Sequence, residues 1–238
     1  MAGVSRLQYT TEIRLIRVMC SGRVDLEFVL RAFSKGIDGV FIGGCRLNEC
    51  NYITHGNYDA LSNVYISKKL LELMGVNPER LTIEFMSAGE GILLTELVNE
   101  FCNKVRELGP LGKGDGANEN GLKFKLEAAT KLVPFIKLVE RERLRAPSKS
   151  EETYNKFFTS DEVDRLFKET IGTKLAISQI MLLLEEKSLS TGEISEILGL
   201  NPSEVSRHMN ISSRQGLVRY DESRKCYTLA KVKEKAAA

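Results

Sequence analysis

Three of the five cysteines in this sequence lie close enough together to share one chemical site. They are Cys20, Cys45 and Cys50, and three glycines flank the group, at which the backbone could approach a bound group closely. Thiolates are preferred ligands of iron–sulfur clusters and of zinc. A single free cysteine is more often a buried packing residue, but three in this arrangement favour a metal site.

The elements predicted around these cysteines would bring them together. Strands are expected at residues 13–19, 39–43 and 81–86, and helices at 26–35, 63–74 and 92–108. Strands that alternate with helices favour an α/β fold, an open parallel sheet with flanking helices of the Rossmann or flavodoxin-like kind. In such sheets functional groups gather beyond the carboxyl ends of the strands. We therefore expect Cys20, Cys45 and Cys50 at one edge of the sheet.

A complete iron–sulfur or zinc site needs four ligands, and this region offers three thiols. His55 is the nearest nitrogen ligand and could complete a zinc site, although an exposed loop position is the simpler interpretation of a lone histidine. Cys102 falls at an apolar helix position and Cys226 in a C-terminal strand, and both are interpreted as packing residues.

Composition sets broad limits on the function. The chain has 238 residues with a formal net charge of +2, which neither favours nor excludes a local nucleic-acid site. No apolar run approaches the roughly 18 residues that a membrane helix needs, and the first residues lack a signal-peptide pattern. An odd number of cysteines argues against a disulfide framework. We therefore expect a cytoplasmic protein without a membrane partner.

The second half of the chain loses its strand signals until near the end. Residues 111–121 are rich in glycine and polar side chains and are predicted to be a linker or exposed loop. Helices are expected at residues 122–132, 135–144, 160–169 and 175–186. The second of these is heavily charged, which indicates a solvated or partner-facing surface. The predicted domains are an α/β domain at 1–112, a helical linker region at 113–172 and a C-terminal domain at 173–238.

The C-terminal sequence resembles a winged helix-turn-helix of the arsenic-repressor kind. Ser190 followed by Glu193 is a capping-box pattern that opens a helix at 193–198, and a recognition helix is expected at 203–215. Strands at 217–220 and 226–229 would form the wing. Side chains that could reach DNA are Arg207, His208, Asn210, Ser212 and Arg214.

Three carboxylates argue against a DNA complex in that module. Glu193, Glu196 and Glu204 would meet phosphate repulsion if they pointed the same way as the basic residues. Winged helices also serve as protein-docking modules. Nucleic acid is therefore a less favoured partner than protein.

The first half of the chain resembles a known family. The stretches IRLIRVMCSGRVD, AFSKGIDGVFIGGCRLNECNY, NPERL and SAGEG together resemble the delta-subunit family of methyl-viologen-reducing hydrogenase, over residues 2 to about 112. The resemblance implies a small iron–sulfur protein with a 2Fe-2S cluster. Family members pass electrons from a hydrogenase or formate dehydrogenase to the flavin subunit of heterodisulfide reductase.

Carried over by position, Cys20, Cys45 and Cys50 match family cysteines, whereas Cys102 and Cys226 match none. Family members usually begin with a further strand that ends in two cysteines two residues apart. In the family an Ala-Gly and a Ser-Arg pair follow that segment, and these are Ala2-Gly3 and Ser5-Arg6 here, so the sequence begins where the segment is expected to end. The resemblance therefore implies a 2Fe-2S cluster whose fourth ligand is not identified in this chain.

These observations favour an iron–sulfur electron-transfer subunit without substrate chemistry of its own. No catalytic triad, phosphate-binding glycine loop or metalloprotease motif is found in the sequence. The first alternative is a metal- or redox-sensing winged-helix transcription regulator. The second is a structural zinc adaptor.

Overall fold

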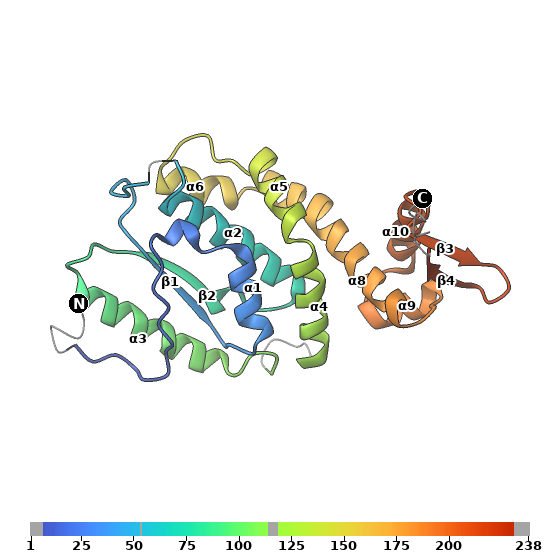
Figure 1. Ribbon diagram of the computed structural model, residues 1–238, viewed down its shortest axis with the longest axis horizontal. Helices are drawn as coiled ribbons and strands as arrows, with labels where there is room; N and C mark the ends of the chain where they lie inside the picture. The colour runs from blue at the N-terminus through green and yellow to red at the C-terminus, as the bar shows by residue number, and fades with distance from the viewer. Residues whose placement is uncertain (1–6, 53, 114–118, 231–238) are drawn as a thin grey trace, which may run out of the picture. The chain divides into compact units, whose positions relative to one another are not determined.

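The computed structural model describes residues 7–52, 54–113 and 119–230 (Figure 1). It divides into two compact units, which are described separately. We call Met1–Asp164 the N-terminal unit and Arg165–Ala238 the C-terminal unit. The finer division at residues 112 and 172 stays a prediction.

A parallel pair of strands lies at the centre of the N-terminal unit. β1 (Val40–Gly44) and β2 (Leu81–Phe85) pair in register from Val40 opposite Leu81 to Gly44 opposite Phe85. α1 (Leu26–Ser34) precedes β1, whereas α2 (Asn57–Met74) and the short helix η2 (Pro78–Arg80) connect the two strands. α3 (Gly91–Leu108) follows β2. The predicted alternation of strand and helix is confirmed for these elements.

Helices cover both faces of this strand pair (Figure 1). The ring of Phe41 packs 5.7 Å from that of Phe101 on α3, and a Cβ atom at Gly39 would lie 2.6 Å from Val105. Side chains alternate along a strand, so Ile42 points to the opposite face. Ile42 and Leu81 are buried there, where α2 packs against β2.

The prediction of a strand at residues 13–19 was wrong. Within the described part of the chain, this segment pairs with no strand, and Leu15, Ile16 and Met19 are 80%, 82% and 89% exposed. A strand forms only where a neighbour satisfies its backbone groups, and an apolar sequence run does not reveal whether a neighbour exists. The described fold is thus mixed and mostly helical, with a small parallel sheet, and a Rossmann-like sheet is not confirmed.

Further helices complete the N-terminal unit. They are α4 (Glu119–Lys131), α5 (Val133–Arg143) and α6 (Glu151–Phe158), and α7 (Asp161–Phe167) crosses the division between the units. α5 turns three apolar side chains inward and links to α2 where Ser62 donates to Glu140 at 3.1 Å. The predicted loop at residues 111–121 falls partly outside the described residues, and α6 was not predicted.

The C-terminal unit has the predicted winged-helix order of elements. A π-helical turn at Lys168–Gly172 leads into α8 (Thr173–Glu186), followed by α9 (Thr191–Leu198) and α10 (Pro202–Arg214). β3 (Val218–Asp221) and β4 (Cys226–Leu229) form an antiparallel hairpin. Both α9 and α10 begin with a capping box, at Ser190 and at Asn201. Ile180, Ile194, Val205 and Met209 are fully buried in the core between these helices.

None of the helices in the described ranges has the length and apolar character needed to cross a bilayer.

A fully buried arginine holds together the end of the strand pair that lies away from the cysteines. Arg80 is 0% exposed, and its guanidinium donates to the carbonyl oxygens of Asp38, Leu108 and Gly109 at 2.8–3.1 Å. These carbonyls come from the loop before β1 and from the end of α3. A buried charge is tolerated only when it is fully hydrogen bonded, so this residue fixes how α3 ends against the sheet.

We expect the Arg80→Met substitution to lower the free energy of unfolding by about 3 kcal/mol, because it leaves buried carbonyl groups without donors. Urea denaturation followed by circular dichroism measures the effect. The control is Arg31→Met, an exposed position on α1, for which we expect a change within about 0.5 kcal/mol. Equal midpoints for the two variants would contradict this role.

Candidate functional site

The loops that follow β1 and β2 meet at the carboxyl edge of the strand pair. Cys45 and Arg46 follow β1 directly, and the backbone N–H of Met86 donates to the Gly44 carbonyl at 2.9 Å just beyond β2. The Arg46 guanidinium forms an ion pair with Glu90, with Nε 3.1 Å from Oε2. Glu90 also accepts the Ser87 N–H at 2.7 Å. The two loops are therefore fastened to each other beside Cys45.

The thiols of Cys20, Cys45 and Cys50 interact with one another at this edge. Cys50 is hydrogen bonded to the thiols of both Cys45 and Cys20. Burial raises the pKa of Cys45, and the hydrogen bond to Cys50 and the charges of the other two thiols raise it further. The structure thus brings together three residues that are up to 30 positions apart.

Cys50 differs from Cys45 because backbone groups act on it. Burial acts to raise the pKa of Cys50, but hydrogen bonds from the backbone N–H groups of Tyr52 and Asn57 and from the two other thiols outweigh it, and the pKa is lowered overall. Cys50 consequently ionises more readily than Cys45, and its sulfur faces donors that suit a thiolate.

Asn57 connects the start of α2 to the Cys45 loop. Its side chain is buried, and Nδ2 donates to the carbonyl oxygens of Cys45 at 3.0 Å and Arg46 at 2.8 Å. The same Nδ2 lies 3.6 Å from Cys45 Sγ, within reach of a hydrogen bond to sulfur. Nothing in the sequence alone pointed to this residue, because its role depends on the loop folding back onto the helix.

Glycines leave the space in which Cys50 lies. A Cβ atom at Gly56 would be 2.5 Å from Cys50 Sγ and would also overlap the Tyr52 carbonyl. A Cβ atom at Gly22 would in turn lie 2.5 Å from the Gly56 carbonyl oxygen. Glycine at both positions therefore allows the turn after Cys20 and the start of α2 to approach each other around the thiols.

A buried hydroxyl lies next to this group. Ser21 is 5% exposed, its Oγ has no hydrogen-bond partner among the described residues, and it lies 3.0 Å from where a Gly44 Cβ would be. An unsatisfied buried hydroxyl costs free energy. Ser21 directly follows Cys20 and packs against Gly44, the residue before Cys45. Its hydroxyl is therefore placed to donate a hydrogen bond to a group held by the thiols.

His55 and the two remaining cysteines each have their own surroundings. The side chain of His55 is 89% exposed, and Nδ1 lies 3.0 Å from an Asp59 carboxyl oxygen, as expected for a loop histidine. Cys226 is buried, and Cys102 is half-buried on α3, where burial raises its pKa.

The three thiols are the right kind of ligand for an iron–sulfur cluster, but they do not form a complete site by themselves. Among the described residues, no three His, Cys, Asp or Glu side chains are arranged to hold one metal ion. Cys50 is nevertheless hydrogen bonded to both other thiols, so the three side chains would need only to reorient to share a metal ion or a two-iron cluster. The thiols, the glycine space at Gly56 and the free Ser21 hydroxyl fit such a group, and a fourth ligand is not identified.

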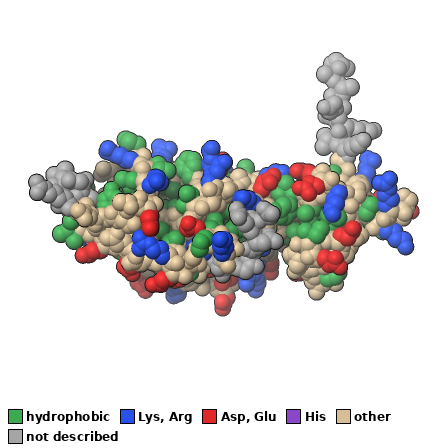
Figure 2. Space-filling model, turned by 90° about the horizontal axis from the view of Figure 1, so that it is seen from below, with side chains coloured by type: hydrophobic (Ala, Val, Ile, Leu, Met, Phe, Trp, Pro, Cys, Tyr) green, Lys and Arg blue, Asp and Glu red, His purple; other side chains and the backbone are tan. Residues whose placement is uncertain are grey.

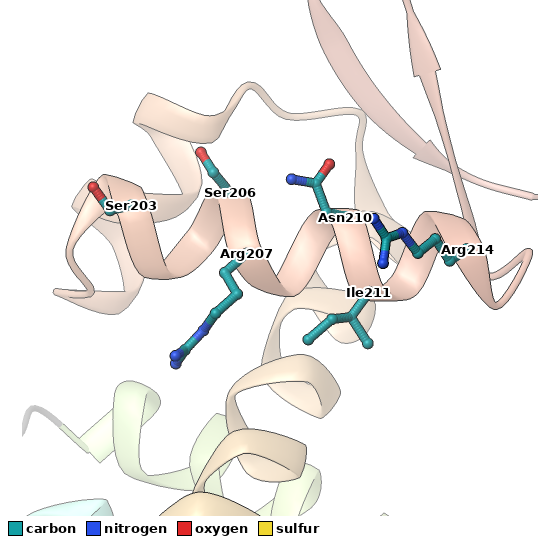
Figure 3. Close-up of a pocket in the computed structure, with 6 residues that line it drawn as sticks. All are labelled: Ser203, Ser206, Arg207, Asn210, Ile211 and Arg214. Atoms are coloured by element: carbon teal, nitrogen blue, oxygen red, sulfur yellow. The ribbon is translucent and has the colours of Figure 1, made fainter.

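A second candidate surface lies on α10. Ser203, Ser206, Arg207, Asn210, Ile211 and Arg214 line one hollow on this helix and appear along one face of it in Figure 3. None of these six side chains carries a carboxyl group. The Glu193 and Glu204 carboxylates accept backbone N–H groups at the starts of α9 and α10, at 2.7 and 3.4 Å. Two of the three carboxylates that were expected to repel DNA phosphates are therefore engaged in helix caps.

Two of the residues predicted to reach DNA point inward instead. His208 is 4% exposed and Ser212 is 0% exposed, and His208 Nδ1 and Ser212 Oγ have no partner among the described residues. Burial lowers the pKa of His208, and the charge of Arg207 lowers it further. These two positions fall on the core side of α10 because they follow Val205 and Met209 at helical spacing. Arg207, Asn210 and Arg214 are exposed as predicted.

Two protein families match this chain, one in its first half and one near its C-terminus. The family of the methyl-viologen-reducing hydrogenase delta subunit matches residues 1–109. The arsR family of bacterial regulatory proteins matches residues 178–220. The thiol group lies within the first match, and α9, α10 and all of β3 but its last residue lie within the second.

Individual relatives each match a little under half of the chain. The iron-sulfur subunit of the F420-non-reducing hydrogenase of Archaeoglobus profundus is 44% identical over 110 residues, which are 46% of this chain and 80% of that protein. The iron-sulfur subunit of the vhc F420-non-reducing hydrogenase of Methanococcus voltae is 44% identical over 109 residues, 46% of this chain and 75% of that protein. One subunit of the Ferredoxin/F(420)H(2)-dependent CoB-CoM heterodisulfide reductase of Methanosarcina acetivorans is 46% identical over 112 residues, which are 47% of this chain, and this chain spans only 14% of it.

We expect the Gly56→Ala substitution to weaken binding of Co²⁺, a probe for thiolate ligands, because the added methyl group displaces the Cys50 sulfur. The thiolate-to-cobalt absorption band, followed during an anaerobic titration of the full chain, measures it. The matched control is Gly89→Ala, where a Cβ atom would meet nothing within 4 Å. Similar affinity in both variants would show that the space at Gly56 does not matter.

Proposed function

Because the chain belongs to the delta-subunit family of methyl-viologen-reducing hydrogenase, we propose that it is an iron–sulfur electron-transfer subunit of an oxidoreductase complex. The observation that carries this proposal is the set of three interacting thiols at the carboxyl edge of β1 and β2, in which Cys50 is hydrogen bonded to both Cys45 and Cys20. These thiols lie within residues 1–109, the part that matches the family, and the chain is 44% identical over 110 residues to an iron-sulfur subunit. The family resemblance drawn from the sequence is confirmed.

The proposed cofactor is a 2Fe-2S cluster held by Cys20, Cys45 and Cys50, with a fourth ligand still to be found. Such a cluster accepts and releases electrons without any rearrangement of covalent bonds in a substrate. The chain's own residues would hold the sulfurs in place, through Asn57 and the backbone N–H groups that face Cys50. Hydrogen bonds to cluster sulfurs are one determinant of reduction potential.

The proposed partners are the flavin subunit of a heterodisulfide-reductase-type complex and a hydrogenase or formate dehydrogenase, in the cytoplasm. The 46% identity over 112 residues to a subunit of a CoB-CoM heterodisulfide reductase supports a partner of this kind. The exposed apolar residues of segment 13–19 lead directly into Cys20. A partner protein bound to that segment would therefore lie close to the thiols.

The proposal predicts a cluster signal that depends on three cysteines. We expect the anaerobically purified full chain, after reduction with dithionite, to give an electron paramagnetic resonance signal of a 2Fe-2S cluster. Cys20→Ser, Cys45→Ser and Cys50→Ser should each diminish or shift this signal, because each removes a thiolate ligand. Cys226→Ser, at a buried position in the other unit, is the control and should leave the signal unchanged. A signal that survives all three ligand substitutions would exclude the proposed ligand set.

A second candidate function is a redox- or metal-sensing transcription regulator. The observation that favours it is the face of α10 defined by Ser206, Arg207, Asn210 and Arg214, which has donors for bases and phosphates and no carboxylate. The hairpin adds the exposed Arg219, Arg224 and Lys225, and blue side chains gather at its end in Figure 2. Recognition helix and wing would then contact adjacent parts of one duplex.

This second function predicts salt-dependent DNA binding by the full chain. Arg207→Ala should weaken binding to random duplex DNA several-fold and reduce the slope of log affinity against log salt by about one, because one phosphate contact is lost. Arg31→Ala, on α1 of the N-terminal unit, is the control. A fluorescence anisotropy titration at several salt concentrations measures both. Undetectable binding at low salt would leave protein docking as the role of the winged helix.

A further inference from the structure

One residue at the start of α2 contacts two of the three sulfurs. The backbone N–H of Asn57 is hydrogen bonded to the Cys50 thiol, and its side-chain Nδ2 lies 3.6 Å from Cys45 Sγ. Asn57 is 2% exposed, so neither donor is competed for by bulk water. Among the described residues, Asn57 alone is found to direct both a backbone donor and a side-chain donor at these thiols.

The orientation of the Asn57 amide is fixed by its other partners. The group that faces the Cys45 and Arg46 carbonyls, at 3.0 and 2.8 Å, must be the NH₂ end, because carbonyl oxygens only accept hydrogen bonds. The end that faces Cys45 Sγ is therefore a donor. A donor directed at sulfur stabilises the more negative, reduced state of a sulfur-bound centre.

We propose that Asn57 is the positioning residue of the thiol centre, holding Cys45 in its ligating orientation and raising the reduction potential of the group bound there. The inference rests on the proposed function. It assigns a role in tuning the centre to a side chain that is not itself a ligand. Groups that orient ligands in this way commonly affect metal affinity by 10–100-fold when they are removed.

The test compares Asn57→Leu with Asn63→Leu in the full chain. Leucine matches asparagine in shape and has no donor, and Asn63 lies on the same helix but donates to the Val24 carbonyl at 3.4 Å. We expect Asn57→Leu to weaken Co²⁺ binding by about 10–100-fold and to shift the thiolate-to-cobalt band. The reduction potential of the reconstituted cluster should fall, and Asn63→Leu should change neither property. Circular dichroism establishes that each variant is folded, and Asn57→Ser replaces Asn57→Leu if leucine prevents folding.

A double-mutant cycle separates positioning from general stabilisation. If Asn57 acts through Cys45, Asn57→Leu should cause no further loss of Co²⁺ affinity in a Cys45→Ser background. Additive losses, equal losses in Asn63→Leu, or an unchanged affinity and potential in folded Asn57→Leu would each overturn the inference while leaving the proposed function intact. A wild-type chain that takes up neither Co²⁺ nor a cluster would overturn the proposed function, and this inference with it.

Discussion

The site depends on the parallel register of β1 and β2. Because Gly44 lies opposite Phe85, the two strands end at the same level, and the loops that follow them leave the sheet side by side. The Arg46–Glu90 ion pair and the Met86 to Gly44 hydrogen bond then fasten these loops together. Cys45 owes its position to this arrangement, and Cys20 and Cys50 approach it through turns that only glycine at 22 and 56 permits.

The N-terminal unit leaves apolar surface uncovered near this edge. Of the 18 residues of α3, only Gly91 and Val98 are buried, although the helix carries apolar side chains along much of its length. Ile92 at its start is 65% exposed, and segment 13–19 has no neighbour in the described sheet. Exposed apolar surface of this kind marks interaction sites in many proteins. A partner protein that docks here would explain why this unit, whose proposed role is to pass electrons onward, keeps such a surface.

Local signals in the sequence predicted most elements but not their partners. The spacing of apolar residues located α1, β1, β2 and α3, and the Ser190 capping box located the start of α9. The apolar run at 13–19 suggested a strand, because periodicity reports burial and propensity and does not report pairing. His208 and Ser212 were placed on the DNA side of α10 by residue type, although their spacing from Val205 and Met209 places them in the core.

The site was predictable in outline only. Cys20, Cys45 and Cys50 were grouped because each follows an apolar run or the loop after one, with glycines nearby. That these three residues bind a cluster is a proposal. The role of Asn57 could not be read from the sequence, since an asparagine at a helix start is usually explained by capping. Its side chain instead reaches back to the Cys45 loop.

The most direct test of the central claim is the metal and sulfide content of the chain, purified anaerobically from its native host through a tag. We expect about two irons and two acid-labile sulfides per chain, counted beyond those of any co-purified protein. Zinc bound without sulfide would contradict an electron-transfer role and favour a structural adaptor or a sensor.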